Sequence, residues 1–85
     1  MQKFYFTYGT SEQYPYKGGW TEVIAETKHM AILAFKVVHP DVHEGILNCA
    51  SVYTEEEFTS SGMTTGNYGA CRHETIILSQ IVKED

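Results

Sequence analysis

Alternating apolar and polar side chains predict four β-strands along the chain. In residues 3–8, Phe4, Phe6 and Tyr8 fall on one face, because successive side chains of a strand point to opposite sides. The last predicted strand is apolar on both faces, which is typical of a central strand or of a strand in a subunit interface. The segments with strand character are residues 3–8, 20–26, 46–53 and 73–82.

Helical periodicity replaces this alternation in two segments. Residues 27–38 carry apolar side chains at offsets of three, four and seven, with Thr27 as the N-cap and Pro40 as the stop. Residues 54–61 begin with Thr54-Glu55-Glu56-Glu57, a capping box whose carboxylates suit the positive end of a helix dipole. This cap accounts for the acidic cluster without a functional role.

The predicted order is β-β-α-β-α-β, an α+β fold. We expect a four-stranded, mostly antiparallel sheet with both helices on one face. Residues 1–85 form a single domain, because 85 residues are too few for two cores. The other face of the sheet would expose aromatic side chains, so we expect a second copy of the chain to cover it in a homodimer or larger assembly.

Composition and charge exclude several classes of function. Hydrophobic residues make up 42% and charged residues 20%, which is the composition of a folding chain. The net charge of −5 argues against a duplex nucleic-acid binder, which needs a basic surface. No run approaches the ~18 apolar residues of a membrane span, and the sequence begins without a signal-peptide pattern. We therefore expect a cytoplasmic protein in which Cys49 and Cys71 are thiols, with a disulfide as the alternative.

Metal ligation and covalent catalysis are both conceivable, and neither is favoured. His39, Asp41 and His43 lie two residues apart in one loop, and Cys71 and His73 alternate on one strand. The paired cysteines typical of structural zinc are missing, however. Cys71 and His73 would also lie side by side along a strand rather than form a hydrogen-bonded dyad. We expect no metal, no cofactor and no catalysis.

The loops carry residues that suit a nucleotide-like ligand. Residues 9–19, 39–45 and 63–73 are expected to form one polar pocket. Aromatic rings there would stack on a base, an arginine and a histidine would meet phosphate, and asparagines would bond the base or ribose. Alternatively, these side chains only hold the loops together. The candidate ligand-binding residues are Tyr14, Tyr16, Trp20, His43, Asn48, Asn67, Tyr68, Arg72 and His73.

Short segments spread over nearly the whole chain form one pattern. They are Phe4-Tyr5-Phe6-Thr7-Tyr8-Gly9, Gly18-Gly19-Trp20-Thr21-Glu22-Val23, His39-Pro40-Asp41, Gly45-Ile46-Leu47-Asn48-Cys49-Ala50, Tyr53-Thr54-Glu55-Glu56 with Phe58, Gly62-Met63, Gly66-Asn67-Tyr68-Gly69-Ala70 and His73-Glu74. This pattern resembles that of a group of small proteins from phages and mobile elements of gut-type bacteria. In that group the cysteine often directly precedes the histidine, whereas Arg72 separates Cys71 from His73 here.

This resemblance implies a role against bacterial host defence, in the host cytoplasm. The expected function is non-enzymatic: the protein would bind and sequester a nucleotide-like immune signalling molecule. One alternative is an acidic decoy that inhibits a host defence protein directly, as anti-CRISPR proteins do. A second alternative is a small structural or regulatory phage protein.

Overall fold

After an initial pair of strands, helices and strands alternate along the chain. The computed structural model describes residues 1–43, 45–62 and 71–81. In these ranges the elements are β1 (Gln2–Thr7), β2 (Trp20–Ala25), α1 (Lys28–Val38), β3 (Ser51–Thr54), α2 (Glu55–Ser60), β4 (Arg72–Ile77) and α3 (Leu78–Ile81).

The four strands form one mixed sheet in the order β3-β1-β2-β4. β1 pairs antiparallel with both β2 and β3, whereas β4 pairs parallel with β2. The predicted α+β fold with a mostly antiparallel four-stranded sheet is thus confirmed. β4 lies at an edge rather than in the centre. β4 is apolar on both faces, and these faces are covered unequally. Ile76 on one face is buried, whereas Ile77 on the other is only half-buried.

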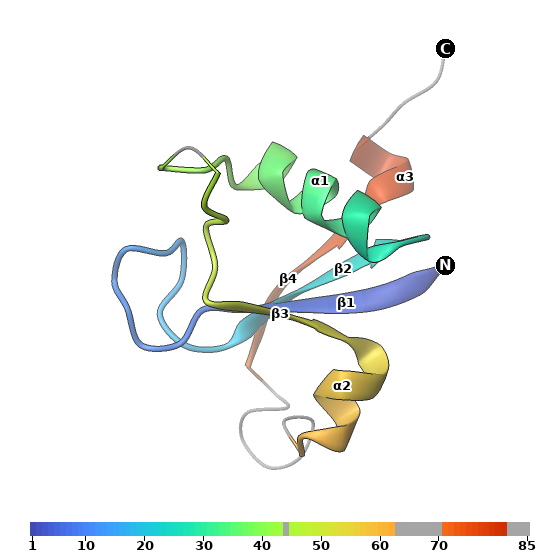
Figure 1. Cartoon of the computed structure of the whole chain (residues 1–85), viewed down its shortest axis with the longest axis horizontal. Helices are drawn as coiled ribbons and strands as arrows, with labels where there is room; N and C mark the ends of the chain where they lie inside the picture. Colours follow the sequence, from blue (N-terminus) through green and yellow to red (C-terminus); the bar gives the residue numbers. More distant parts are fainter. Residues whose placement is uncertain (44, 63–70, 82–85) are drawn as a thin grey trace.

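The two longer helices lie on opposite faces of the sheet (Figure 1). Phe35 of α1 stacks on Phe6 at 4.4 Å, and Phe58 of α2 stacks on Tyr5 at 4.3 Å. Tyr5 and Phe6 are neighbours in β1, so their side chains point to opposite sides. The prediction that both helices cover one face is therefore wrong. β3 passes directly into α2 at Thr54, which folds this helix over the other face.

Local capping signals define both helices as predicted. The Thr27 hydroxyl accepts from the Met30 N–H at 3.1 Å at the start of α1. In the capping box of α2, Thr54 Oγ1 accepts from the Glu57 N–H at 3.2 Å, and Glu57 Oε1 accepts from the Thr54 N–H at 2.9 Å. Phe58 is buried in the sheet face beneath α2. Each helix thus begins where the sequence alone places it.

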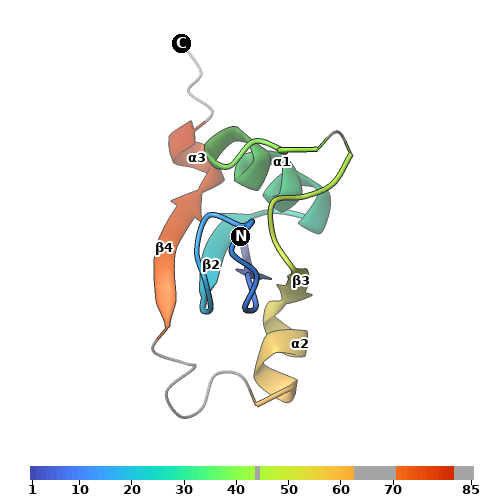
Figure 2. The ribbon, with the colours of Figure 1, turned by 90° about the vertical axis from the view of Figure 1, so that its left-hand side faces the viewer.

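Two predicted strands are shorter than expected. Of the predicted strand over residues 46–53, only residues 51–53 belong to β3. Residues 46–50 instead cross the end of the sheet, where the Ala50 N–H donates to the Thr7 carbonyl at 2.7 Å. Of residues 73–82, the strand ends at Ile77 and a helical turn, α3, follows beside α1 (Figure 2). Among the described residues, no helix combines the length and apolar character needed to cross a bilayer.

Candidate functional site

Two loops at one end of the sheet enclose a cavity of about 140 Å³. Residues 9–19 contribute one wall, and residues 42–48 contribute the other. Among the described residues that line it there is no carboxylate. The lining residues are Gln13, Tyr14, Val42, His43, Ile46, Leu47 and Asn48.

Backbone hydrogen bonds close both loops. The Gly18 N–H donates to the Gly9 carbonyl at 2.6 Å, which closes the first loop. In the second loop the Ile46 N–H donates to the His43 carbonyl at 3.0 Å. Gly45 has a φ of +79°, a left-handed conformation that glycine adopts without the steric cost of a Cβ. The walls of the cavity are therefore built on closed turns.

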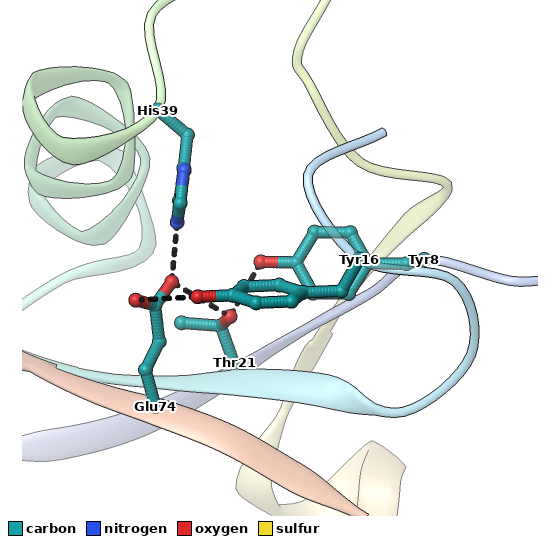
Figure 3. A network of polar contacts seen from close by, with 5 residues as sticks. All are labelled: Tyr8, Tyr16, Thr21, His39 and Glu74. Carbon is teal, nitrogen blue, oxygen red and sulfur yellow. Dashed lines mark hydrogen bonds and ion pairs between the residues drawn. The ribbon is translucent and has the colours of Figure 1, made fainter. Parts of the chain in front are cut away.

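A polar cluster next to these loops is centred on the Glu74 carboxylate (Figure 3). Glu74 Oε1 contacts His39 Nε2 and accepts from Thr21 Oγ1 at 3.1 Å. Glu74 Oε2 accepts from the Tyr16 hydroxyl at 3.4 Å. A carboxylate offers acceptor oxygens, which suits an N–H donor at His39 Nε2. The cluster joins β4, β2, the end of α1 and the loop of residues 9–19.

The donors around Glu74 form a chain that continues into the core. Thr21 uses its hydrogen toward Glu74, so the adjacent buried Tyr8 hydroxyl donates to Thr21 Oγ1. Burial raises the pKa of Tyr8, and the Glu74 charge raises it further. Loss of solvent contact and the same charge also raise the pKa of Tyr16. Both phenols stay protonated at neutral pH and serve as donors.

A bulge in the pairing of β2 with β4 directs His73 to the same face as Glu74. Trp20 pairs with Arg72 and Thr21 pairs with Glu74, so His73 is an extra residue in β4. Its ring stacks on Tyr16 at 4.4 Å with an interplanar angle of 3°. Its Nε2 donates to the Gly18 carbonyl at 2.8 Å. His73 therefore holds the loop of residues 9–19 against the sheet.

Gly19 makes this close approach possible. A Cβ at this position would lie 2.3 Å from the Cys71 carbonyl oxygen and 2.5 Å from His73 Nε2. Its φ of +72° is also in the left-handed region. The Gly18-Gly19 pair marks a loop in the sequence, and its second glycine allows this loop to pack closely against Cys71 and His73.

The opposite face of the sheet carries a different cluster. Trp20 is buried edge-on against Tyr5 and Phe58, with ring centroids 5.2 Å from each. Buried Glu22 accepts from the Tyr5 hydroxyl at 3.4 Å and forms an ion pair with Arg72 at 3.6 Å. Burial, followed by the charge of Glu22, raises the pKa of Tyr5 to about 12. This face is held together by rings and by strand-to-strand contacts.

The predicted ligand-binding residues do not all meet in one recess. Tyr14, His43 and Asn48 line the cavity, whereas Tyr16 and His73 stack on each other and do not line it. Trp20 and Arg72 lie on the opposite face, because neighbouring residues of a strand point to opposite sides. The expectation that these seven residues share a single pocket is therefore wrong. Asn67 and Tyr68 lie outside the described residues.

The chain matches no family model, no curated protein and no solved structure. Its function must therefore be inferred from the site itself.

The candidate metal ligands have other partners. His39 binds Glu74, and Asp41 forms an ion pair with Lys36 at 3.3 Å. Within residues 1–43, 45–62 and 71–81, no group of three or more His, Cys, Asp or Glu side chains is arranged to hold a metal ion. Both cysteines are thiols, and burial followed by the Asp41 charge raises the pKa of the Cys49 thiol to about 11. Cys49 is therefore protonated at neutral pH.

No pattern in the sequence indicates the central role of Glu74. Its partners lie 35 to 58 positions away, so spacing could not associate them. The apolar cavity residues Val42, Ile46 and Leu47 were also not anticipated. The one available signal was their position around Gly45, since apolar side chains in a loop often mark a contact surface.

Proposed function

We propose that this protein binds and sequesters a nucleotide-like small molecule whose base enters the cavity between residues 9–19 and 42–48. The observation that carries this proposal is the combination of Tyr14, Asn48 and His43 around one ring-sized space. A tyrosine offers an aromatic face, an asparagine offers a donor and an acceptor, and a histidine can meet an anion. No catalytic step is part of the proposal.

The size of the cavity suits a single base. Its volume of about 140 Å³ is close to the ~150 Å³ of an engineered apolar cavity that accommodates one benzene ring. A complete nucleotide would not fit, so ribose and phosphate would stay outside. Tyr14 and Asn48 are half-buried whereas His43 is exposed, which suits a base in the interior and a phosphate at the rim.

Charge narrows the class of ligand. The described lining residues hold no carboxylate that would repel a phosphate, but the whole chain carries a net charge of −5. A polyanion such as a nucleoside triphosphate would be repelled by this field. We therefore favour ligands with few charges, such as cyclic mononucleotides, cyclic dinucleotides and cyclic ADP-ribose isomers.

A titration series tests the proposal. Isothermal calorimetry and thermal shift with these cyclic nucleotides, with AMP and GMP as linear references, should give binding and a higher melting temperature for at least one compound. Tyr14→Ala should weaken that binding by about 5- to 150-fold, since stacking contributes ~1–3 kcal/mol per base. Tyr53→Ala is the matched control, because Tyr53 is also half-buried but packs on the α2 side.

Two outcomes would contradict the proposal. One is the failure of every compound to bind. The other is equal loss of binding in Tyr14→Ala and Tyr53→Ala, which would show that stability rather than contact with the ligand is affected.

A second candidate is direct binding to a host protein, and it is favoured by the rim of the cavity. Val42 is 71% exposed and Ile46 is 60% exposed, so two apolar side chains project from one turn. Such side chains suit a protein contact. Co-purification of one host protein that is lost in Val42→Glu and kept in Tyr14→Ala would support this candidate; loss in neither variant would count against it.

A further inference from the structure

Two side-chain amides line the small cavity at the end of the sheet, one from each of its walls. Gln13 belongs to the wall of residues 9–19, and Asn48 belongs to the wall of residues 42–48. Within the residues that the structure describes, neither side-chain amide has a hydrogen-bond partner. Each amide therefore offers a ligand one carbonyl acceptor and two N–H donors.

We propose that the base bound in this cavity is adenine; the inference rests on the proposed function and specifies its ligand class. The amino group N6 of adenine lies between two ring nitrogens, N1 and N7. Each ring nitrogen forms, together with N6, an edge with one donor and one acceptor. An amide pairs with such an edge through two hydrogen bonds, as Asn and Gln do with adenine in DNA. The two amides of the cavity thus match the two edges of one adenine ring.

Guanine matches the cavity less well. Its N1–H and O6 can pair with one amide, but O6 and N7 are both acceptors, an edge that arginine or lysine reads with two donors. The described lining residues include neither arginine nor lysine. Guanine also carries an amino group at position 2, and a carboxylate would be a strong acceptor for it. Among the described lining residues there is none.

The apolar part of the lining also favours adenine. Val42, Ile46 and Leu47 supply it. They suit the C–H groups at positions 2 and 8 of adenine, whereas the position-2 amino group of guanine loses free energy in an apolar contact. A pyrimidine has only one edge that combines a donor with an acceptor, so it would use only one of the two amides. With N6 innermost, N9 points outward, and the ribose leaves the cavity beside the exposed His43.

Isothermal calorimetry with two matched pairs of compounds tests this inference. Cyclic AMP is compared with cyclic GMP, and cyclic di-AMP with cyclic di-GMP. The two members of a pair have the same charge and the same sugar and phosphate groups, so the ratio of their dissociation constants reports the base alone. We expect the adenine compound to bind about 5- to 150-fold more tightly in at least one pair, which is the discrimination of one good amide–base pair.

Asn48→Asp and Gln13→Glu test the two amides directly. Each substitution replaces the amide donor by a carboxylate oxygen of similar size, so the ratio should fall at least about fivefold. The added charge repels both members of a pair alike and cancels in the ratio. Gln2→Glu is the matched control, because it adds the same charge at an amide that donates to the Glu26 carbonyl at 2.8 Å, outside the cavity lining. Its ratio should equal that of the wild type.

Thermal melting checks that the variants are folded. Gln13 is exposed whereas Asn48 is half-buried, so Gln13→Glu carries the test if Asn48→Asp does not fold. Equal affinity within both pairs, tighter binding of the guanine compounds, or an unchanged ratio in a folded cavity variant would overturn the inference and leave the proposed function standing. Failure of all the cyclic nucleotides to bind would overturn both.

Discussion

Each face of the sheet holds one carboxylate, and the two are bound by different parts of the chain. On the α2 side, Glu22 is bound by side chains of the strands beside it, β1 and β4. On the α1 side, Glu74 is bound by the loop of residues 9–19, by β2 and by the end of α1. Glu22 therefore joins strands that the backbone ladder already joins.

Glu74 instead also binds segments that lie outside the strands. Tyr16 belongs to a loop, and His39 follows the last turn of α1. These two residues adjoin the segments that line the cavity between residues 9–19 and 42–48. The contacts of Glu22 on the α2 side therefore stabilise the sheet itself. The contacts of Glu74 on the α1 side stabilise the fold and also hold the segments next to the cavity in place.

The largest expected effect comes from truncating the ring at the centre of each face. Phe35→Ala should lower the free energy of unfolding by ~3–5 kcal/mol, as is usual for a buried phenylalanine. Phe58→Ala should cost about 3 kcal/mol, because it leaves the larger core intact. Urea denaturation measures both. A greater loss in Phe58→Ala would reverse the ranking of the two faces.

Next in size is the close approach at Gly19. Gly19→Ala should destabilise the fold by roughly 2–3 kcal/mol, since its Cβ would clash with the Cys71 carbonyl and its φ is positive. Gly18→Ala is the matched control: φ is +78° there, but no atom lies within 4 Å of the added Cβ. It should cost only about 1 kcal/mol. Equal melting temperatures for the two variants would refute the proposed packing of His73 and this loop.

A smaller effect is expected from neutralising either carboxylate. Glu74→Gln and Glu22→Gln should each cost about 1–2 kcal/mol, since each weakens charge-assisted hydrogen bonds. Only Glu74→Gln should speed hydrogen exchange of the Gly18 and Ile46 amides, which close the loops. Exchange rates that change equally in both variants would remove the distinction between the two faces.

The smallest expected effect is a pH-dependent change in stability at the N-terminus of α2. Hydrogen bonds from the Thr54 backbone and side chain hold the pKa of Glu57 below its usual value. Because the folded pKa is lowered, the stabilisation is present at neutral pH and is lost as the pH falls through that folded value. Urea unfolding should thus separate wild type from Glu57→Gln at pH 7 more than at about pH 3. Glu56→Gln, outside the capping box, should show no such narrowing.

Local features of the fold could be predicted from the sequence, and non-local ones could not. The Thr54–Glu57 capping box and the Thr27 cap each depend on residues within three positions. The face covered by α2, the edge position of β4 and the bulge at His73 depend on pairing between distant segments. Arg72 and His73 illustrate this limit. The sequence predicts that both bind one phosphate, but their side chains point to opposite faces of the sheet.

The parallel pairing of β4 with β2 has a consequence for how the chain acquires its structure. Thr21 and Glu74 are 53 positions apart, so their contact closes a much longer loop than the β1–β2 hairpin does and costs more chain entropy. During synthesis on the ribosome, one edge of β2 stays open until residues 72–77 emerge. At that stage the nascent chain exposes the unpaired edge of β2, with which strands of other chains could pair. Pairing with β4 covers this edge.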